Sequence, residues 1–187
     1  KTSENEDRLV KHFYRNSDIV VAEGLTAKHP DRAKYPHLEG MEEYCEFYEA
    51  DQQREIDSLM KKSGVGLAET LALNHERLEG QQRFVNLVSH MEMHRDFLEG
   101  KTVLDFGCAY GHYTQALARR FPEVDFVGVD ITRCNVDAAK EWAKYEKVKN
   151  VTFYHNSEVP ELEEVGLLIL GEVVEHVPNP QDFANTV

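Results

Sequence analysis

The sequence is poor in cysteine and contains no long apolar run. Its 187 residues include three cysteines, Cys45, Cys108 and Cys134, and their spacing forms no CxxC or other pair. Unpaired cysteines predict reduced thiols. The sequence shows no signal-peptide pattern, no apolar segment of the length that spans a bilayer and no internal repeat. These absences predict a cytoplasmic protein that has no membrane partner.

Basic residues are also scarce. The chain has 21 Lys and Arg against 34 Asp and Glu, which gives a formal net charge of −13. Binding to nucleic acid depends on neutralising phosphates with Lys and Arg, so this charge disfavours a nucleic-acid partner. The charge does not restrict small uncharged or cationic ligands.

A dinucleotide-binding G-x-G-x-x-G fingerprint is missing as well. In its place the chain has VLDFGCAYGHYT, from Val103 to Thr114. This segment reads as a buried strand, a turn of small residues and a helix that opens at about Gly111, whose free N–H groups face the turn. Asp105 puts a carboxylate in the turn, which would repel a phosphate and suits a ligand with positive charge. The pattern predicts a small-molecule site at the carboxyl end of a strand.

This segment resembles motif I of the class I S-adenosylmethionine (SAM) methyltransferases, whose cofactor carries an ammonium and a sulfonium. The resemblance implies that the methionine pocket is shaped by the small residues of the turn and that Asp105 organises the ammonium end. Those small residues are Gly107, Cys108, Ala109 and Gly111. The family usually has glycine where Ala109 stands, so the match departs from the family pattern by one methyl group.

Two further strands carry candidate cofactor residues. The strand 124–129 ends in Asp130, about twenty residues after the turn, where a carboxylate can accept hydrogen bonds from both ribose hydroxyls. The alternative is that Asp130 caps the helix expected over 135–147, although Thr132 is available for that task. After the strand 151–154, the resemblance implies that Asn156 accepts from the adenine amino group; solvation in a loop is the alternative.

A fourth strand, 165–170, leads into Gly171-Glu172-Val173-Val174-Glu175-His176. This resembles the motif after strand four in ubiquinone-pathway O-methyltransferases and small-RNA 3′-terminal 2′-O-methyltransferases. On a helix Glu172, Glu175 and His176 share one face, and together they are a fair ligand set for Mg²⁺ or Mn²⁺. Without a metal, His176 would act as general base or only make structural hydrogen bonds.

The sequence predicts two segments. Residues 100–187 are expected to form a Rossmann-like α/β half-domain with a parallel sheet, and the resemblance implies three more strands for which no sequence is left. Residues 1–99 are expected to form a helical extension, with helices over 41–62, 67–78 and 81–93. This extension is predicted to be a substrate lid; a scaffold or an oligomer contact is the alternative.

The prediction for function is SAM-dependent methyl transfer, to oxygen before nitrogen, on a small-molecule or glycan acceptor. Catalysis is expected from positioning, with deprotonation helped by His176 or by a metal held by Glu172, Glu175 and His176. Three alternatives stay open: a metal-assisted RNA 2′-O-methyltransferase, an NAD(P)-dependent oxidoreductase and a non-catalytic SAM-binding module. The acceptor itself and the oligomeric state are not predicted.

Overall fold

The computed structural model describes residues 20–23, 41–79 and 81–173. Its centre is a five-stranded sheet in the order β1-β5-β2-β3-β4, with every neighbouring pair parallel. The strands are β1 (Val20–Glu23), β2 (Thr102–Phe106), β3 (Asp125–Asp130), β4 (Val151–His155) and β5 (Val165–Gly171). All strands run the same way, so all their carboxyl ends lie at one edge of the sheet.

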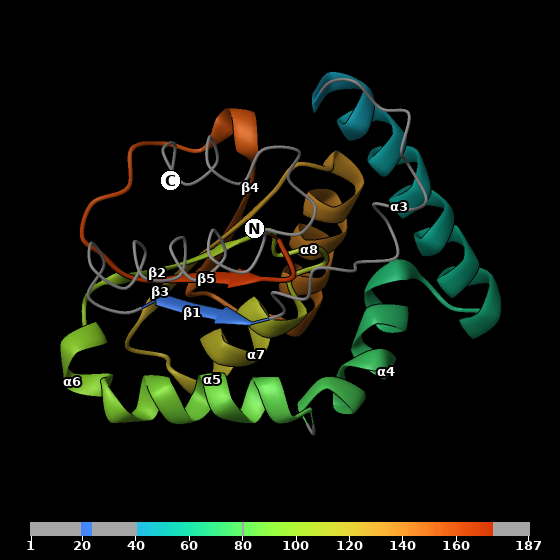
Figure 1. The fold of residues 1–187 in the computed structure, drawn as a ribbon. Helices are drawn as coiled ribbons and strands as arrows, with labels where there is room; N and C mark the ends of the chain where they lie inside the picture. Colours follow the sequence, from blue (N-terminus) through green and yellow to red (C-terminus); the bar gives the residue numbers. More distant parts are fainter. Residues whose placement is uncertain (1–19, 24–40, 80, 174–187) are drawn as a thin grey trace, which may run out of the picture.

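The helices fall into two groups, which Figure 1 shows around the sheet. Before β2 are α3 (Met41–Ser63), α4 (Leu67–Glu79), α5 (Gln82–Met93) and the short α6 (Arg95–Leu98). Between the strands lie α7 (His112–Arg120), α8 (Arg133–Glu146) and the 3₁₀ turn η1 (Asn156–Glu158). Both α7 and α8 pack on β3 and β4, while α3 and α4 pack against α8.

The α/β fold with a parallel, Rossmann-like sheet is confirmed. The four strands predicted after residue 100 are present to within one residue at each end, and the predicted helices 41–62, 67–78 and 81–93 are present as α3, α4 and α5. The predicted helical extension also contains one strand, which the sequence analysis does not include. Backbone pairing of Val20–Glu23 with Leu168–Gly171 adds β1 to the sheet edge formed by β5.

The helices before residue 100 share the core of the sheet. Phe84, Leu87 and Met91 of α5 are buried in one cluster with Leu117 and Phe121 from the α7 region. A second cluster joins the extension to α8 and to the turn after β2, through Ile56, Leu71, Tyr110, Ala138 and Trp142. Burial of each large side chain contributes roughly 1.5–3 kcal/mol, so these shared clusters stabilise the helices and the sheet region together.

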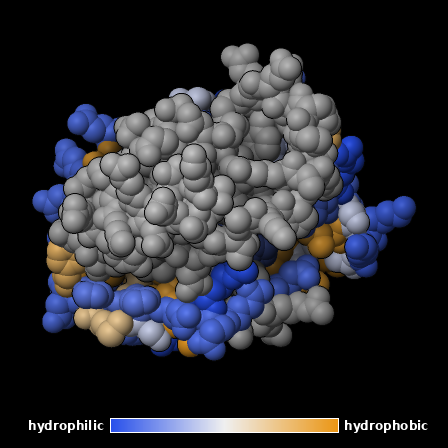
Figure 2. Space-filling view, in the orientation of Figure 1, coloured by the Kyte–Doolittle hydropathy of each residue, from blue (hydrophilic) through white to orange (hydrophobic). Residues whose placement is uncertain are grey.

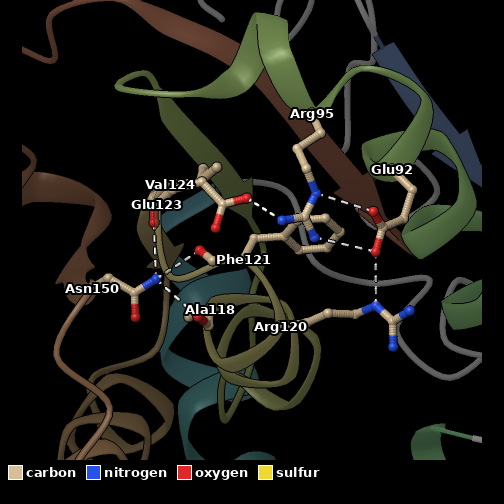
Figure 3. Close-up of polar contacts among 8 residues, drawn as sticks. All are labelled: Glu92, Arg95, Ala118, Arg120, Phe121, Glu123, Val124 and Asn150. Atoms are coloured by element: carbon tan, nitrogen blue, oxygen red, sulfur yellow. Dashed lines mark hydrogen bonds and ion pairs between the residues drawn. The ribbon is translucent and has the colours of Figure 1, made fainter.

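A network of hydrogen bonds and ion pairs lies at the opposite edge of the sheet, at the amino ends of the strands (Figure 3). The side-chain amide of Asn150 donates toward the carbonyl oxygens of Ala118, Phe121 and Val124, at 2.9, 3.1 and 2.9 Å. Ala118 lies in the last turn of α7, where helix carbonyls lack intrahelical partners. The Asn150 side chain therefore provides hydrogen bonds to carbonyl groups at the end of α7 and in the loop that leads to β3.

Arg95 ties the start of α6 to the same region. Its guanidinium donates to Glu92 at 3.1 Å and to Glu123 at 2.6 Å, and it lies 4.8 Å above the centre of the Phe121 ring (Figure 3). Glu92 also accepts from Arg120 at 3.3 Å. These ion pairs are partly exposed and each contributes little, so their main effect is to fix where α5 and α6 meet α7.

The described surface fits the acidic composition. In Figure 2 the side chains that are not grey are mainly hydrophilic, with scattered hydrophobic residues between them. Lys140, Lys144, Lys147 and Lys149 are exposed around α8, as expected for solvated lysines. Within the described ranges, no helix has both the length and the apolar character that a bilayer crossing requires.

Candidate functional site

The sequence-predicted residues gather at the carboxyl edge of the sheet. From β2 the chain passes to β3 and β4 on one side, and β5 then returns to the other side of β2. Parallel sheets bind ligands where the strand order reverses in this way, outside the carboxyl ends of the two strands concerned. Here that place lies between the turn after β2 and the end of β5.

The turn after β2 is held against β3 by its own backbone. The N–H groups of Gly107 and Cys108 both donate to the carbonyl oxygen of Val129, at 2.7 and 3.0 Å. Gly107, Ala109 and Gly111 have φ of +79°, +47° and +72°, so three alternate residues are left-handed. At Ala109 this conformation costs about 1–2 kcal/mol, which explains why glycine suits the position better.

The glycines of the turn are required by packing inside the protein. A Cβ atom at Gly107 would collide with the side chain of Val173, and one at Gly111 would lie 2.5 Å from the Phe153 ring. The sequence predicts that these small residues make room for a ligand. In the structure the space beside Gly107 and Gly111 is filled by Val173 and Phe153, so these glycines by themselves do not identify a ligand.

Asp105 lies in the strand that precedes the turn, not in the turn itself. It is inside β2, beneath the turn, and only 5% exposed; the prediction that the acid sits in the turn is therefore wrong. Its Oδ2 accepts a 2.6 Å hydrogen bond from the hydroxyl of Thr114 in α7. Burial raises the pKa of Asp105 to about 6, the Thr114 bond opposes that rise, and the nearby charge of Asp130 adds to it.

Asp130 is the most heavily hydrogen-bonded of the predicted residues. Its Oδ2 accepts from the N–H of Ala109 at 2.9 Å, which joins the end of β3 to the turn after β2. Its Oδ1 accepts from the N–H and the hydroxyl of Thr132, at 2.9 and 2.7 Å, and more weakly from Asn135 at 3.4 Å. At 4% exposure, this carboxylate holds two segments of the site together.

Thr132 occupies the N-cap position of α8, as the sequence allows, but its side chain does not cap the helix. Its hydroxyl is used by Asp130 instead. The first N–H groups of α8 donate to a carboxylate from α3: Arg133 N to Oε2 of Glu49 at 2.6 Å and Cys134 N to Oε1 at 2.8 Å. Glu49, rather than Asp130 or Thr132, therefore caps α8.

The remaining predicted cofactor residues lie at the same edge. Cys108 is buried, and its burial, reinforced by Asp105 and Asp130, raises the pKa of the thiol well above its usual value, so it acts as a small neutral side chain. Asn156 begins η1 directly after β4 and is exposed to solvent. This placement is compatible with adenine binding and with loop solvation, so its role stays a prediction.

Glu172 follows β5 and has a left-handed backbone, with φ of +59°. Its carboxylate forms an ion pair with the guanidinium of Arg83 in α5. Glu175 and His176 lie outside the described residues, and no cluster of three metal-ligating side chains occurs among the residues that the structure describes. The Mg²⁺ or Mn²⁺ site and the general-base role of His176 therefore stay predictions.

The sequence alone does not reveal the residues that reach the site from the preceding helices and from α7 and α8. Glu49, Gln52 and Arg83 contact the site across more than 50 residues of sequence, while Thr114 and Asn135 hold the two buried acids. Gln52 is visible in the sequence only as part of the apolar stripe of its helix. No local pattern marks Glu49 or Arg83, because their partners are distant in the chain.

The comparisons with known proteins agree with this geometry. Residues 98–187 match a family model described as a methyltransferase domain. This part of the chain therefore resembles the class I SAM-dependent methyltransferases, as the sequence predicts. The match begins at Leu98, the last residue of α6, and contains all the cofactor residues that the sequence predicted.

Curated relatives of the methyltransferase domain act on different acceptors. A ubiquinone biosynthesis O-methyltransferase of Acinetobacter baylyi is 35% identical over 95 residues, which are 48% of this chain and 39% of that protein. A tRNA (guanine-N(7)-)-methyltransferase of Porphyromonas gingivalis is 39% identical over 62 residues, 32% of this chain and 25% of that protein. The chain thus spans well under half the length of these relatives.

Among solved structures, PKMT2 from Rickettsia typhi in complex with AdoHcy aligns with 47% of this chain and 18% of its own. The identity is 22% and the TM-score is 0.42.

Proposed function

We propose that the chain is a SAM-dependent methyltransferase that acts on an oxygen of a small-molecule or glycan acceptor. The observation that carries the proposal is electrostatic. Asp105 and Asp130 are both nearly buried at the carboxyl ends of adjacent strands, and among the described residues neither pairs with a cation. Buried carboxylates without a counter-ion are costly, and a ligand that brings positive charge removes part of that cost.

The same charges separate the candidate cofactors. The ammonium and sulfonium of SAM would be attracted to Asp105 and Asp130, whereas the pyrophosphate of NAD(P) would add negative charge beside them. The turn also lacks the glycine spacing of the dinucleotide fingerprint. These two arguments favour SAM over the oxidoreductase alternative.

Asp130 is the proposed ribose ligand. Its Oδ2 accepts from Ala109, and a carboxylate oxygen has room for a second donor, so a ribose hydroxyl can be added without breaking that bond. Asp105 is proposed to act at the methionine end through its charge, since Thr114 already donates to it. Asn156, exposed after β4, is the proposed partner of the adenine.

When bound, SAM supplies a methyl group on a positively charged sulfur. The chain's own contribution is then to hold the donor rigidly, so that an acceptor oxygen placed in line with the methyl group reacts without a search for orientation. His176 is proposed to take the acceptor's proton. The net charge of −13 disfavours an RNA acceptor, although one curated relative carries a tRNA methyltransferase name.

The direct test is calorimetric titration of the chain with S-adenosylhomocysteine and, separately, with NADH. We expect micromolar binding of S-adenosylhomocysteine, a free energy of about 8 kcal/mol, and no heat with NADH. Binding of NADH without S-adenosylhomocysteine would favour an oxidoreductase. Binding without transfer of labelled methyl to phenolic, glycan or RNA acceptors would favour a non-catalytic module.

The raised pKa of Asp105 gives a prediction for pH. A carboxyl group with a folded pKa near 6 and an unfolded value near 3.8 holds its proton more tightly in the fold, so its contribution to stability falls as pH rises between these values. The full loss is about 3 kcal/mol, of which about 2 kcal/mol falls between about pH 4.5 and pH 7.5. We therefore expect Asp105→Asn to stabilise the unliganded chain increasingly over this range.

Urea unfolding of both proteins at several pH values measures this difference, since titration of all other groups cancels. The same substitution should weaken binding of S-adenosylhomocysteine, because the neutral amide no longer attracts the ammonium. A stability difference that does not change with pH would show that Asp105 is ionised with an ordinary pKa in the fold.

A further inference from the structure

The start of α8 is capped from outside its own segment. The first N–H groups of a helix have no intrahelical partners and carry the positive end of the helix dipole, so a carboxylate is a favourable cap. Glu49 of α3 accepts from Arg133 N at 2.6 Å and from Cys134 N at 2.8 Å, one donor for each carboxylate oxygen. The Cys134 thiol also donates to the carbonyl of Glu49, with an S···O distance of 3.8 Å.

The capped end of α8 carries the donors that reach Asp130. The hydroxyl of Thr132, at the N-cap position, donates to Oδ1 of Asp130 at 2.7 Å, and Asn135 in the first turn donates to the same oxygen at 3.4 Å. By holding the first N–H groups of α8, Glu49 fixes the segment that presents these donors, without itself touching Asp130.

Gln52 adds a second connection one helical turn further along α3. Its Oε1 accepts from Asn135 at 3.3 Å and from the hydroxyl of Tyr110 at 3.4 Å. Tyr110 belongs to the turn after β2, and Asn135 in turn donates weakly to Asp130. Gln52 thus connects α3 to both segments that surround the proposed cofactor.

The helix that presents these side chains is anchored firmly. Glu49, Gln52 and Ile56 are spaced i, i+3 and i+7, which places them on one face of α3. Ile56 is 2% exposed and packs in the cluster with Trp142 of α8. Because Glu49 and Gln52 bond to the first residues of α8, this face of α3 meets the start of that helix; α3 and α8 are neighbours in the fold (Figure 1).

We infer that Glu49 and Gln52 are positioning residues for the cofactor site: they hold the start of α8 and the turn after β2 so that Asp130 is preset to accept the ribose. This inference rests on the proposed function. It assigns α3 to binding of the methyl donor, whereas the sequence predicts that the extension is a lid over the acceptor.

The test is a double-mutant cycle on the full chain, with S-adenosylhomocysteine affinity measured by calorimetry. We expect Glu49→Gln to weaken binding about tenfold, because the amide keeps the size of the side chain but offers one acceptor for two N–H groups. Asp130→Asn alone should weaken it more. If Glu49 acts through Asp130, adding Glu49→Gln to Asp130→Asn should cause little further loss.

Glu46→Gln is the matched control, since Glu46 is exposed on the same helix and its substitution makes the same change of charge; its affinity should equal that of the wild type. A purely structural role for Glu49 predicts either a lower melting temperature with unchanged affinity or losses that multiply with those of Asp130→Asn. Either result overturns the inference while leaving the proposed function intact.

Wild-type protein that binds no S-adenosylhomocysteine would instead overturn the proposed function, and this inference with it. If Glu49→Gln does not fold, Gln52→Met replaces it in the cycle. That variant keeps the length of the side chain and removes its amide group, whose oxygen accepts from Asn135 and Tyr110. The same non-multiplying pattern with Asp130→Asn is expected, and independent losses again contradict the inference.

Discussion

Replacing Asp130 with asparagine is expected to weaken the binding of S-adenosylhomocysteine about a hundredfold, or about 2.7 kcal/mol. Two losses combine in this figure. The ribose hydroxyls lose a charged acceptor, a loss of about 1.5–3 kcal/mol. The site itself is also disturbed, because the carboxylate accepts from donors on both of its oxygens and an amide has only one acceptor oxygen.

The amide of the variant has one favourable orientation. With its oxygen toward Thr132 it keeps the donors that serve Oδ1, and its NH₂ group then faces the N–H of Ala109. Two donors facing each other leave the Ala109 N–H unsatisfied in the turn after β2, which adds about 1–3 kcal/mol. We therefore expect Asp130→Asn to reduce stability as well as affinity, and urea unfolding separates the two effects.

Asp125→Asn is the matched control for this variant. Asp125 is the first residue of the same strand and is exposed, so the substitution makes the same change of charge away from the carboxyl edge. Its affinity and stability should stay close to those of the wild type. If Asp130→Asn bound S-adenosylhomocysteine within threefold of the wild type, the assignment of Asp130 to the ribose would be wrong.

The elements after residue 100 could be predicted because their signals are local. Aliphatic runs such as Val165–Leu170 lie in strands covered by neighbours, and the turn at Gly107–Gly111 joins strand to helix within a dozen residues. The alternation of strands and helices along the chain then places Asp105 and Asp130 on adjacent parallel strands. The sequence could not predict that Asp105 lies beneath the turn, since its burial depends on Thr114 and on the packing of α7.

What could not be predicted depends on contacts between distant residues. Four residues at Val20–Glu23 are too few for a periodic pattern, and they form a strand only because β5 offers an unpaired edge. In the sequence Glu49 looks like any acidic residue on an exposed helix face, because its partner at the start of α8 follows 84 positions later in the chain. The ion pair between Arg83 and Glu172 likewise joins distant residues, 89 positions apart in the chain, and no local pattern predicts it.

Replacing Gly111 with alanine is expected to destabilise the fold by roughly 2–5 kcal/mol, the largest effect on stability that we predict. Gly111 has φ of +72°, a left-handed backbone that costs an alanine about 1–2 kcal/mol. The added methyl group would also lie 2.5 Å from Cζ of Phe153 and 3.3 Å from Cβ of Ala139, and overpacking of this kind costs about 1–3 kcal/mol. Urea unfolding measures the sum.

Substitutions at two other glycines separate the backbone cost from the overpacking cost. Gly100 has φ of +73°, and a Cβ atom added there would have no atom within 4 Å, so Gly100→Ala should show the backbone cost alone. Gly128 lies in β3, where such an atom would collide with Cδ1 and Cε1 of the same Phe153 ring and lie 3.0 Å from Sγ of Cys108, so Gly128→Ala should show the overpacking cost. Phe153 is 1% exposed and cannot move aside into solvent.

Replacing Phe153 with a smaller side chain then tests whether its ring causes the overpacking cost. In a Phe153→Leu background, Gly111→Ala should cost clearly less than in the wild type, because its methyl group gains the space that Cζ and Cε1 of the ring vacate. Gly111→Ala should keep the backbone part of its cost there, about as much as Gly100→Ala. Equal costs for Gly111→Ala in both backgrounds would show that the Phe153 ring is not what requires glycine at this position, and the small residues of the turn would again need a ligand to explain them.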